Sequence, residues 1–503
     1  MRLERVKNTK RNILVGETDK IVGILLPFIV RTMIIHVMGA EYLGLTSLFY
    51  SILQMLNLMD MGFGSSIIYS MYKPIAENDE KTISALMRFY SKVYRVIGLS
   101  MLGVGIALLP FLPHLIKGEP PEDINIYILY LIFVGNSVLN CLLFPNRKAL
   151  FTAYQRDDVS GVMHIITQVL MYATQMIAVM LSKDYYLYIL TIPASTVIYS
   201  VLCAISGRKM FGTYSKGEKL PEDVYKNIRK QVVGLMVRKI ASYSRNAFDS
   251  MFVSAYLGLA INGIYGNYYY VMDAIVMVLA VLKTSMAGGV GNSIAMETVE
   301  KNNVDMTTFN FLFMTISGWC AICLLCLYQP FMKIWVGEAL SLPMYMALTF
   351  SIYFYILKMA DIRTLYAESV GIWWQGRYLS VIEAVMNILL NWLFIKFMGL
   401  FGIVLATMIS YFIFNFIGGA ILLYKYYFKN VSIKDYFVQH AIYLFVTCII
   451  AVPTFFVSEM IKVDGIPGLI LKALICVFIP GIMYLLIYCR TENFKKAVKL
   501  IKL

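Results

Sequence analysis

The chain has 503 residues, of which 59% are hydrophobic and only 15% are charged, and its mean hydropathy is +0.69. Apolar stretches of bilayer-spanning length alternate with short polar joints, which predicts an all-α polytopic membrane protein rather than a soluble domain. The formal net charge of +14 does not indicate nucleic acid as a partner, because the Lys and Arg residues gather in alternate joints between the apolar stretches.

About fourteen transmembrane helices are predicted. They cover residues 13–37, 43–72, 83–112, 124–150, 158–182, 185–210, 231–257, 262–292, 307–335, 343–366, 373–398, 401–427, 438–460 and 467–489. The N-terminal sequence is hydrophilic and the first apolar stretch has no small-residue cleavage site, so this stretch is expected to remain as a span rather than be removed as a signal peptide. Basic joints alternate with short neutral or acidic ones, apart from the acidic joint at 297–305, and this pattern predicts that both termini are cytoplasmic.

The second predicted span carries polar residues near its middle, among them Asn57 and Asp60. A carboxylate at the centre of a bilayer costs roughly 2.5–3.5 kcal/mol, so Asp60 is expected to face the protein interior or a wet cavity. Gly64 falls at helical spacing from both residues and can share their face of the helix.

The same segment carries a family resemblance. Its opening GAEYLGLTSLF at 39–49, its close DMGFGSSIIYSMYKPIAEND at 60–79 and the stretch 88–94 resemble the polysaccharide-transport branch of the multidrug/oligosaccharidyl-lipid/polysaccharide exporter superfamily. The similarity is strong over roughly the first hundred residues and is weaker but collinear beyond them.

A shift of 219 residues aligns the first half of the chain with the second. It pairs Lys20 with Lys239, Gly39 with Gly258, Gly44 with Gly263 and Gly118 with Gly337. Six spans repeated in the same orientation predict two six-helix lobes related by a pseudo-twofold axis along the membrane normal, with two C-terminal helices outside the repeat. The predicted division is an N-lobe at 1–210, a cytoplasmic linker at 211–230, a C-lobe at 231–430, spans 13 and 14 at 431–490 and a basic cytoplasmic tail at 491–503.

Basic residues inside the spans are the candidate substrate-binding groups. Lys20 and Arg31 lie three helical turns apart on one face of the first span, and Arg238 and Arg245 lie seven residues apart in the seventh. Because the repeat matches the first two spans with the seventh and eighth, these cations and Lys283 are expected to converge on one cavity, where Arg can clamp phosphate oxygens. Structural ion pairing, and snorkelling of Lys20 and Arg238 to the membrane surface, are the alternatives.

Acidic residues in the same spans are candidates for coupling transport to an ion. Asp19, Asp60, Asp249 and Asp273 can bind Na⁺ or a proton, and balancing the nearby cations is an equally good interpretation. Near the end of the tenth span, by contrast, Lys358 and Asp361 are expected to pair locally at i, i+3 spacing.

The sequence predicts neither an enzyme nor a bound metal or cofactor. Its four His residues are scattered, and neither a phosphate-binding loop nor a catalytic constellation occurs. Cys320, Cys323 and Cys326 are interpreted as buried thiols of an apolar helix, because no carboxylate or His accompanies them.

The resemblance implies a flippase that moves an undecaprenyl-diphosphate-linked oligosaccharide repeat unit, destined for O-antigen, capsule or another surface polysaccharide, across the bacterial inner membrane by alternating access. No motif for ATP hydrolysis occurs, so an ion gradient is the expected drive. The expected partners are lipid-linked oligosaccharide, Na⁺ or H⁺, the membrane and a polysaccharide polymerase with its chain-length machinery. In related flippases, cations of the first, second, seventh and eighth spans face the headgroup; here the second span departs by offering Asp60.

Alternative functions stay open. A multidrug or cation antiporter of the same superfamily typically has twelve spans and an acidic cavity, whereas this chain has two extra spans and several buried cations. A membrane glycosyltransferase or repeat-unit polymerase usually needs a sizeable outer loop, and every predicted outer joint is short. A purely structural scaffold would leave the buried charge unexplained.

Overall fold

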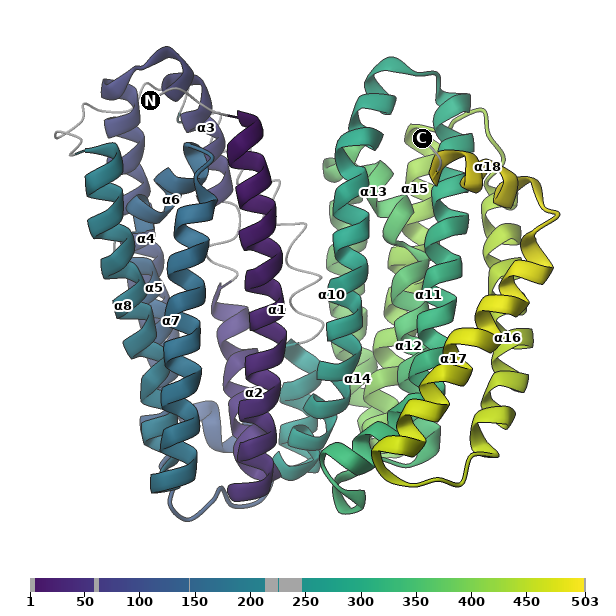
Figure 1. The fold of residues 1–503 in the computed structure, drawn as a ribbon. Helices are drawn as coiled ribbons and strands as arrows, with labels where there is room; N and C mark the ends of the chain where they lie inside the picture. Colours follow the sequence, from purple (N-terminus) through teal and green to yellow (C-terminus); the bar gives the residue numbers. More distant parts are fainter. Residues whose placement is uncertain (1–4, 58–62, 144, 213–224, 226–246, 502–503) are drawn as a thin grey trace. The chain divides into compact units, whose positions relative to one another are not determined.

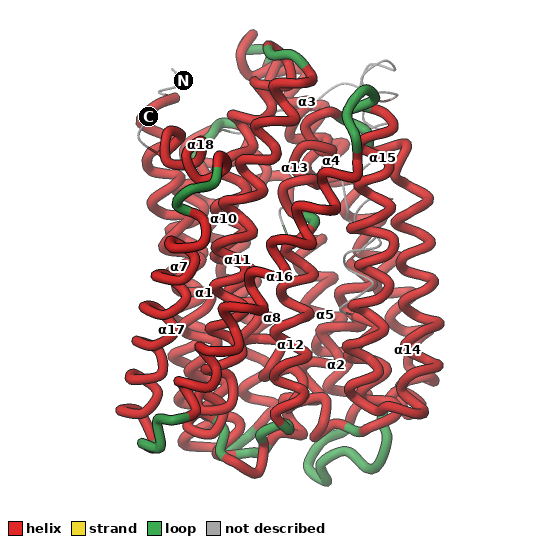
Figure 2. The backbone as a smooth tube through the Cα atoms, turned by 90° about the vertical axis from the view of Figure 1, so that its right-hand side faces the viewer, coloured by secondary structure: helices red, strands yellow, loops and turns green. Residues whose placement is uncertain are grey.

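Helices make up almost all of the chain that the computed structural model describes, namely residues 5–57, 63–143, 145–212, 225 and 247–501 (Figure 1). Within these residues there are no strands (Figure 2). This arrangement confirms the predicted all-α polytopic fold.

The chain divides into two compact units, Met1–Gly263 and Ile264–Leu503. The first unit contains α1 (Arg5–Val37), α2 (Ala40–Leu56), α3 (Phe63–Glu77), α4 (Glu80–Leu108), η2 (Leu109–Leu115), α5 (Ile126–Leu142), α6 (Pro145–Ala153), α7 (Asp157–Ile177), η3 (Ala178–Ser182), α8 (Tyr185–Phe211) and the start of α10 (Leu259–Met296). In this unit α1 packs along α7, α5 and α7 both pack against α8, and α4 packs against α3 and α5.

The second unit is organised around one long helix, α11. It contains the rest of α10, α11 (Val299–Trp335), η4 (Glu338–Leu340), α12 (Met344–Met359), α13 (Asp361–Val370), α14 (Trp373–Ser410), η5 (Tyr411–Gly418), α15 (Gly419–Tyr426), α16 (Ile433–Glu459), α17 (Gly465–Tyr488) and α18 (Glu492–Ile501). Helix α11 packs against α12, α16, α17 and α18, whereas α14 packs against α12 and η5.

The helices lie where the hydropathy of the sequence predicts them, but some predicted spans are divided or joined differently. Nine helices among the described residues are long and apolar enough to cross a membrane, or ten if Ile126–Leu142 and Arg147–Ala153 form one bent span. The tenth predicted span is divided between two shorter helices, α12 and α13. The second includes parts of α2 and α3 together with residues 58–62, which lie outside the described part of the chain. The eleventh and twelfth form one run that is interrupted at Gly399, where φ is 56°. The seventh, 231–257, lies largely outside the described residues, and its residues 247–257 are helical.

Short polar side chains mark where several of these helices begin. The capping residues are Asp79 for α4, Asn125 for α5, Asp184 for α8, Thr298 for α11 and Ser432 for α16. Each accepts a hydrogen bond from a backbone N–H that the first helical turn leaves without an intrahelical partner. Asp79 accepts from both the hydroxyl and the backbone N–H of Thr82, and these bonds lower the pKa of the Asp79 carboxyl.

Glycines that the 219-residue repeat pairs share the same backbone conformation. Gly39 before α2 has a φ of 113°, and Gly258 before α10 has a φ of 100°. Gly118 and Gly337 likewise have φ values of 88° and 86°. Because residues with a Cβ rarely adopt such values, the repeat in the sequence is a repeat of backbone geometry.

The start of α10 crosses α2 within the first unit at two more glycines of the repeat. A Cβ atom at Gly44 would overlap the carbonyl oxygen of Leu259, and a Cβ atom at Gly263 would overlap that of Ala40. Leu259 is the repeat partner of Ala40, so the two contacts are reciprocal. The crossing is reinforced by Asn262, whose amide Nδ2 donates to the carbonyl of Gly44 at 3.0 Å.

Candidate functional site

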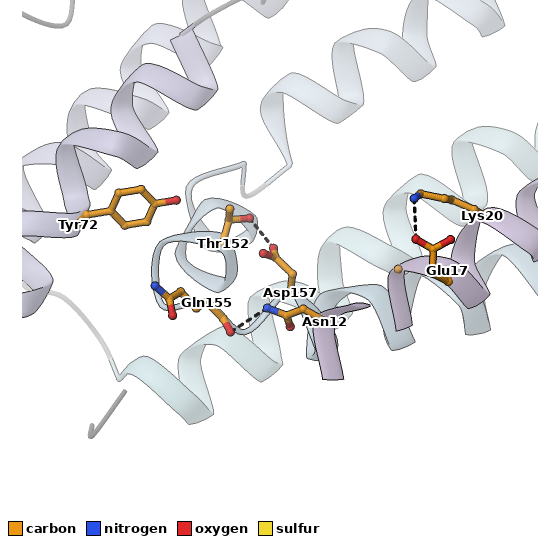
Figure 3. A pocket seen from close by; sticks show the side chains of 8 residues that line it. Asn12, Glu17, Lys20, Tyr72, Thr152, Gln155 and Asp157 are labelled. Carbon is orange, nitrogen blue, oxygen red and sulfur yellow. Dashed lines mark hydrogen bonds and ion pairs between the residues drawn. The ribbon is translucent and has the colours of Figure 1, made fainter. Parts of the chain in front are cut away.

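A polar cavity of about 370 Å³ opens in the first unit (Figure 3). Helix α1 contributes Asn12, Gly16, Glu17 and Lys20, α3 contributes Tyr72, and the region joining α6 to α7 contributes Thr152, Gln155 and Asp157. Lys20 therefore lies in a polar cavity, where its Nζ is 2.9 Å from Glu17 Oε1. Because 51% of the Lys20 side chain is exposed, this ion pair is worth at most about 1 kcal/mol, and Lys20 can exchange Glu17 for a ligand.

Asn12 fixes the floor of this cavity by joining α1 to the turn between α6 and α7. Its Nδ2 donates to the carbonyl of Gln155 at 3.2 Å, and its Oδ1 accepts from the backbone N–H of Asp158 at 2.7 Å. On the same turn, the Thr152 hydroxyl donates to Asp157 Oδ1 at 2.7 Å. The side chains that line the cavity are thus held by one hydrogen-bonded turn and one helix.

Asp19 lies between Glu17 and Lys20 on α1, but its side chain contacts helix α7. Its Oδ1 lies 2.8 Å from Nδ1 of His164 on α7, and about a third of each side chain is exposed, 31% and 38% respectively. The His164 ring also meets the ring of Tyr199 edge-on, with centroids 5.2 Å apart. The predicted site residue Asp19 is thus held by a histidine of a neighbouring helix and not by Lys20.

Two other predicted site residues of the first unit lie deeper in the bundle. Arg31 on α1 is within electrostatic range of the phenols of Tyr185 and Tyr188 on α8. Asp249 is 1% exposed and belongs to the helical residues 247–257. Charged groups at such positions in an apolar bundle are costly, which favours a functional or paired role for each.

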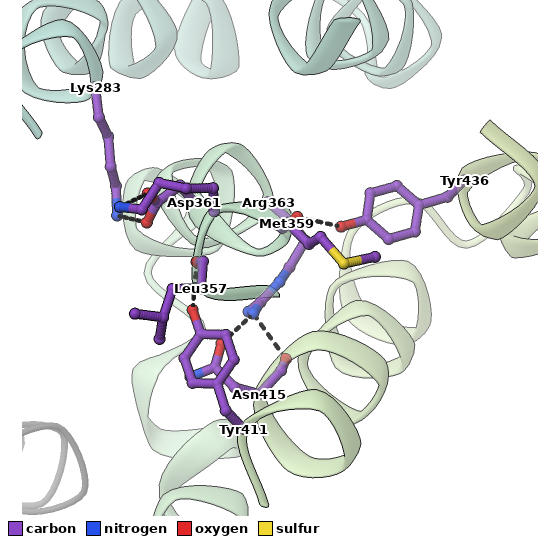
Figure 4. A network of polar contacts seen from close by, with 9 residues as sticks. Lys283, Leu357, Met359, Asp361, Arg363, Tyr411, Asn415 and Tyr436 are labelled. Atoms are coloured by element: carbon purple, nitrogen blue, oxygen red, sulfur yellow. Dashed lines mark hydrogen bonds and ion pairs between the residues drawn. The ribbon is translucent and has the colours of Figure 1, made fainter. Parts of the chain in front are cut away.

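In the second unit, Asp361 at the start of α13 contacts two lysines, Lys283 and Lys358. Figure 4 shows Lys283 reaching Asp361. Oδ2 of Asp361 is 2.8 Å from Nζ of Lys358, and its Oδ1 is 3.4 Å from Nζ of Lys283 on α10. The pair with Lys358 is the local i, i+3 pair that the sequence predicts. Lys283 is the more exposed of the two lysines and makes the longer contact, so it is the partner that Asp361 holds less firmly. Asp273 lies within electrostatic range of Lys358.

A second buried charge in this unit, Arg363, serves to join helices. Its Nη2 donates to both the backbone carbonyl and Oδ1 of Asn415, each at 2.8 Å (Figure 4). Nδ2 of Asn415 in turn donates to Glu383 Oε2 at 3.4 Å. Asn415 lies in η5, a π-helical segment, and a Cβ at Gly419 would overlap the guanidinium. The network holds α13 against η5 and α14, and Arg363 is 6% exposed, so it is not presented to a ligand.

Three predicted site residues, Asp60, Arg238 and Arg245, lie outside the described residues. The convergence of the five cations on one cavity therefore stays a prediction. Within the described part of the chain, no group of three or more His, Cys, Asp or Glu residues is arranged to hold a metal ion.

Sequence reasoning missed most of the residues that surround the predicted ones, and three of them show why. The sequence indicates Asp361 only as the partner of Lys358, because its contact with Lys283 joins residues 78 positions apart. His164, a lone histidine in an apolar span, is a usable signal for the partner of Asp19. Gln155 carries no signal in the sequence, since its place in the cavity depends on a turn with a φ of 58°.

Comparisons with known proteins support one assignment of family and fold. The family model described as "Polysaccharide biosynthesis protein" matches residues 9–287. No curated protein matches the chain.

Among solved structures, the chain is similar to an inward-facing multidrug resistance MATE family transporter of the MOP superfamily, at 12% identity and a TM-score of 0.63, covering 79% of this chain and 94% of that one. It is similar to the lipid II flippase MurJ in an inward closed conformation, at 15% identity and a TM-score of 0.63, covering 95% and 98%. It is also similar to an outward-facing MATE family transporter, at 14% identity and a TM-score of 0.51, covering 84% and 97%. At these identities the likeness is one of fold.

Proposed function

The chain belongs to the polysaccharide biosynthesis protein family, and on that premise we propose that it flips an undecaprenyl-diphosphate-linked oligosaccharide repeat unit across the bacterial inner membrane. The repeat unit is a precursor of a surface polysaccharide such as O-antigen or capsule. The chain acts as a transporter and not as an enzyme, and its expected partners are a polysaccharide polymerase and the chain-length machinery.

The observation that carries this proposal is the lysine pair of the second unit. Lys283 and Lys358 lie within an apolar bundle and both contact the carboxylate of Asp361. An ammonium inside an apolar bundle is costly unless a group of opposite charge contacts it. Phosphate oxygens can replace a carboxylate as that group. Because Lys358 keeps Asp361 neutralised, Lys283 can leave the carboxylate for a diphosphate headgroup at low cost.

The cations of the first unit complete the proposed substrate site. Lys20 and Arg31 on α1 would contact the same headgroup, together with Arg238 and Arg245 of the seventh span. This arrangement follows from the repeat, which matches the first and second spans with the seventh and eighth. The N-lobe at 1–210 and the C-lobe at 231–430 would then rock about the site, while the prenyl tail stays in lipid.

We propose that an ion gradient drives this alternating access. The contact between Asp19 and His164 supports Asp19 as a coupling residue, because an acid and an imidazole that share a hydrogen bond can bind and release a proton. Asp60, Asp249 and Asp273 are further candidates, and Na⁺ is the alternative ion. The distribution of Lys and Arg among the joints supports a cytoplasmic location for both termini.

A multidrug antiporter is the second candidate function, because the fold is similar to that of MATE family transporters. The lysine pair favours the flippase, since a site for cationic drugs is expected to offer carboxylates without competing ammonium groups. Uptake of a cationic dye driven by an opposing ion gradient would favour the antiporter.

The test is a flipping assay in liposomes with a defined undecaprenyl-diphosphate-linked oligosaccharide. Lys283→Met, Arg31→Ala and Arg245→Ala should each slow translocation of the headgroup by about tenfold or more, since each removes one charge-assisted contact to phosphate. Lys301→Met is the matched control, because Lys301 pairs with Asp305 at an exposed helix start. Unchanged translocation in all three variants would reject the proposed substrate site.

A further inference from the structure

The lining of the polar cavity around Lys20 contains carboxylates and amides, which a site for phosphate alone does not require. We propose that this cavity binds a pyranose ring of the transported oligosaccharide, an inference that rests on the proposed function. Its volume of about 370 Å³ lies in the range of about 300–1,000 Å³ that is usual for small-molecule sites. The cavity lies entirely within the first unit, so it can be considered without reference to the second.

The described lining of the cavity carries more carboxylate than ammonium. Glu17 and Asp157 supply two carboxylates, and Lys20 supplies the one ammonium among the described lining residues. Lys20 is in contact with Glu17 at 2.9 Å, so the carboxylate of Asp157 is the second acceptor of the lining. Carboxylates accept hydrogen bonds from hydroxyls, which suits a neutral or amino sugar attached to the diphosphate.

The remaining hydrogen-bonding atoms of the lining can pair with the hydroxyls of a sugar. Asp157 uses Oδ1 to accept from Thr152, and its second carboxylate oxygen can accept from a sugar hydroxyl. The amide of Gln155 and the ammonium of Lys20 can donate to the same ring. Adjacent hydroxyls of a pyranose both donate and accept, so they can satisfy this mixture of carboxylate, amide and ammonium.

Tyr72 adds an apolar surface to this polar lining. Figure 3 shows its hydroxyl directed toward Thr152 and Asp157, with the ring flanking the cavity. The residue is 42% exposed, and its ring meets that of Tyr69 edge-on, with centroids 6.1 Å apart. The C–H face of a pyranose is apolar and can pack on such a ring while its hydroxyls contact the opposite wall.

The turn that ends α6 places Gln155 in the cavity wall. Its φ of 58° is the left-handed conformation in which many helices end, and the backbone N–H of Arg156 donates to the carbonyl of Phe151 across this turn at 2.7 Å. Asn12 holds the backbone carbonyl of Gln155 at 3.2 Å, so the side-chain amide of the same residue is kept beside the cavity.

The experiment measures binding of two kinds of probe to the full chain in lipid nanodiscs. One probe is undecaprenyl diphosphate without sugar, and the other is a panel of the same lipid carrying glucose, galactose, N-acetylglucosamine or N-acetylgalactosamine. The wild-type chain should bind at least one sugar-bearing probe about tenfold more tightly than the sugar-free lipid. Gln155→Ala, Asp157→Asn and Tyr72→Ala should remove most of that preference and leave the affinity for the sugar-free lipid unchanged.

Two glycine variants separate a loss of binding from a loss of folding. Gln155→Gly relieves the backbone strain, so it should raise the unfolding temperature and still lose the preference for sugar. Asn78→Gly is the matched control: Asn78 has a φ of 54° in the joint between α3 and α4, outside the cavity, so it should raise the unfolding temperature and keep the preference. Lys283→Met should weaken binding of both probes equally.

Three other outcomes would contradict the sugar site or the proposed function. A wild-type preference that survives Gln155→Ala and Asp157→Asn would show that the sugar binds elsewhere. Equal affinity of the wild-type chain for all probes would exclude a sugar site. Failure of the wild-type chain to bind any probe would reject the proposed function, and this inference with it.

Discussion

Gly44 of α2 and Gly263 of α10 each lie against the backbone of the other's helix. A methyl group at either position would overlap a carbonyl oxygen, that of Leu259 in the first case and that of Ala40 in the second. The contact can form only because both residues lack a Cβ, and it joins helices that the repeat relates to each other.

Gly44→Ala and Gly263→Ala should therefore each destabilise the protein by about 1–3 kcal/mol, the usual cost of forcing an extra methyl group into a packed contact. Gly103→Ala is the matched control, because Gly103 lies inside α4 and a Cβ atom there would meet no other atom within 4 Å. That variant should be neutral or more stable by up to about 1 kcal/mol. Thermal unfolding of the purified chain measures all three, and equal stability of Gly44→Ala and Gly103→Ala would contradict the close crossing.

Asp361 gives a second prediction, about the lysine pair. Asp361→Asn should cost about 3–5 kcal/mol, because it leaves the buried ammonium of Lys358 without a carboxylate. Lys358→Met should cost less, since Lys283 still pairs with Asp361. A double-mutant cycle on unfolding free energies, with Asp361→Asn, Lys358→Met and both together, measures the coupling. Additive losses would show that the two side chains do not stabilise each other.

A third prediction concerns the ion gradient that is proposed to drive transport. Asp19→Asn keeps a hydrogen-bonding group opposite His164 but removes the charge. Transport driven by an ion gradient should fall by about tenfold or more, while exchange of substrate at equal concentrations on both sides should continue, because exchange needs no net ion movement. Asp305→Asn, in the exposed pair with Lys301, is the control. A parallel loss of both activities would instead assign Asp19 to substrate binding or folding.

The pH dependence of stability should include a contribution from Asp79. Its pKa is lowered in the folded chain by the Thr82 hydrogen bonds, so its stabilising effect is present above the usual value of 3.8 and is lost as the pH falls through the lower folded value. Asp79→Ala should lower the unfolding temperature at about pH 7, and this difference should shrink as the pH falls below 3.8. A difference between wild type and variant that stays constant across this range would exclude a role for the ionised carboxyl.

The sequence predicts the helices well because hydropathy alone decides where a chain can cross a bilayer. The interruption at Gly399 and the paired glycines Gly39 and Gly258 fall where the pattern and the repeat indicate. The local pair of Lys358 with Asp361 is predictable from spacing, since i, i+3 separation on a helix fixes which side chains meet.

The partners of charged groups on different helices are not predictable in this way. The contact of Asp19 with His164 joins positions 145 residues apart, and that of Lys283 with Asp361 joins positions 78 apart. Both depend on how helices rotate against one another, which spacing within one helix does not determine. The cavity around Lys20 likewise depends on the turn at Gln155, whose left-handed backbone no composition signal indicates.

The carboxylate that touches Lys283 also bears on the unloaded carrier. In the proposed transport cycle the site is empty once the cargo has been released, and an unpaired ammonium in an apolar bundle would then be costly. Asp361 lies 3.4 Å from Lys283 within the same unit, so it can serve as a resident counter-ion while the site is empty. On this proposal, the empty protein would not need to capture a foreign anion before its next cycle.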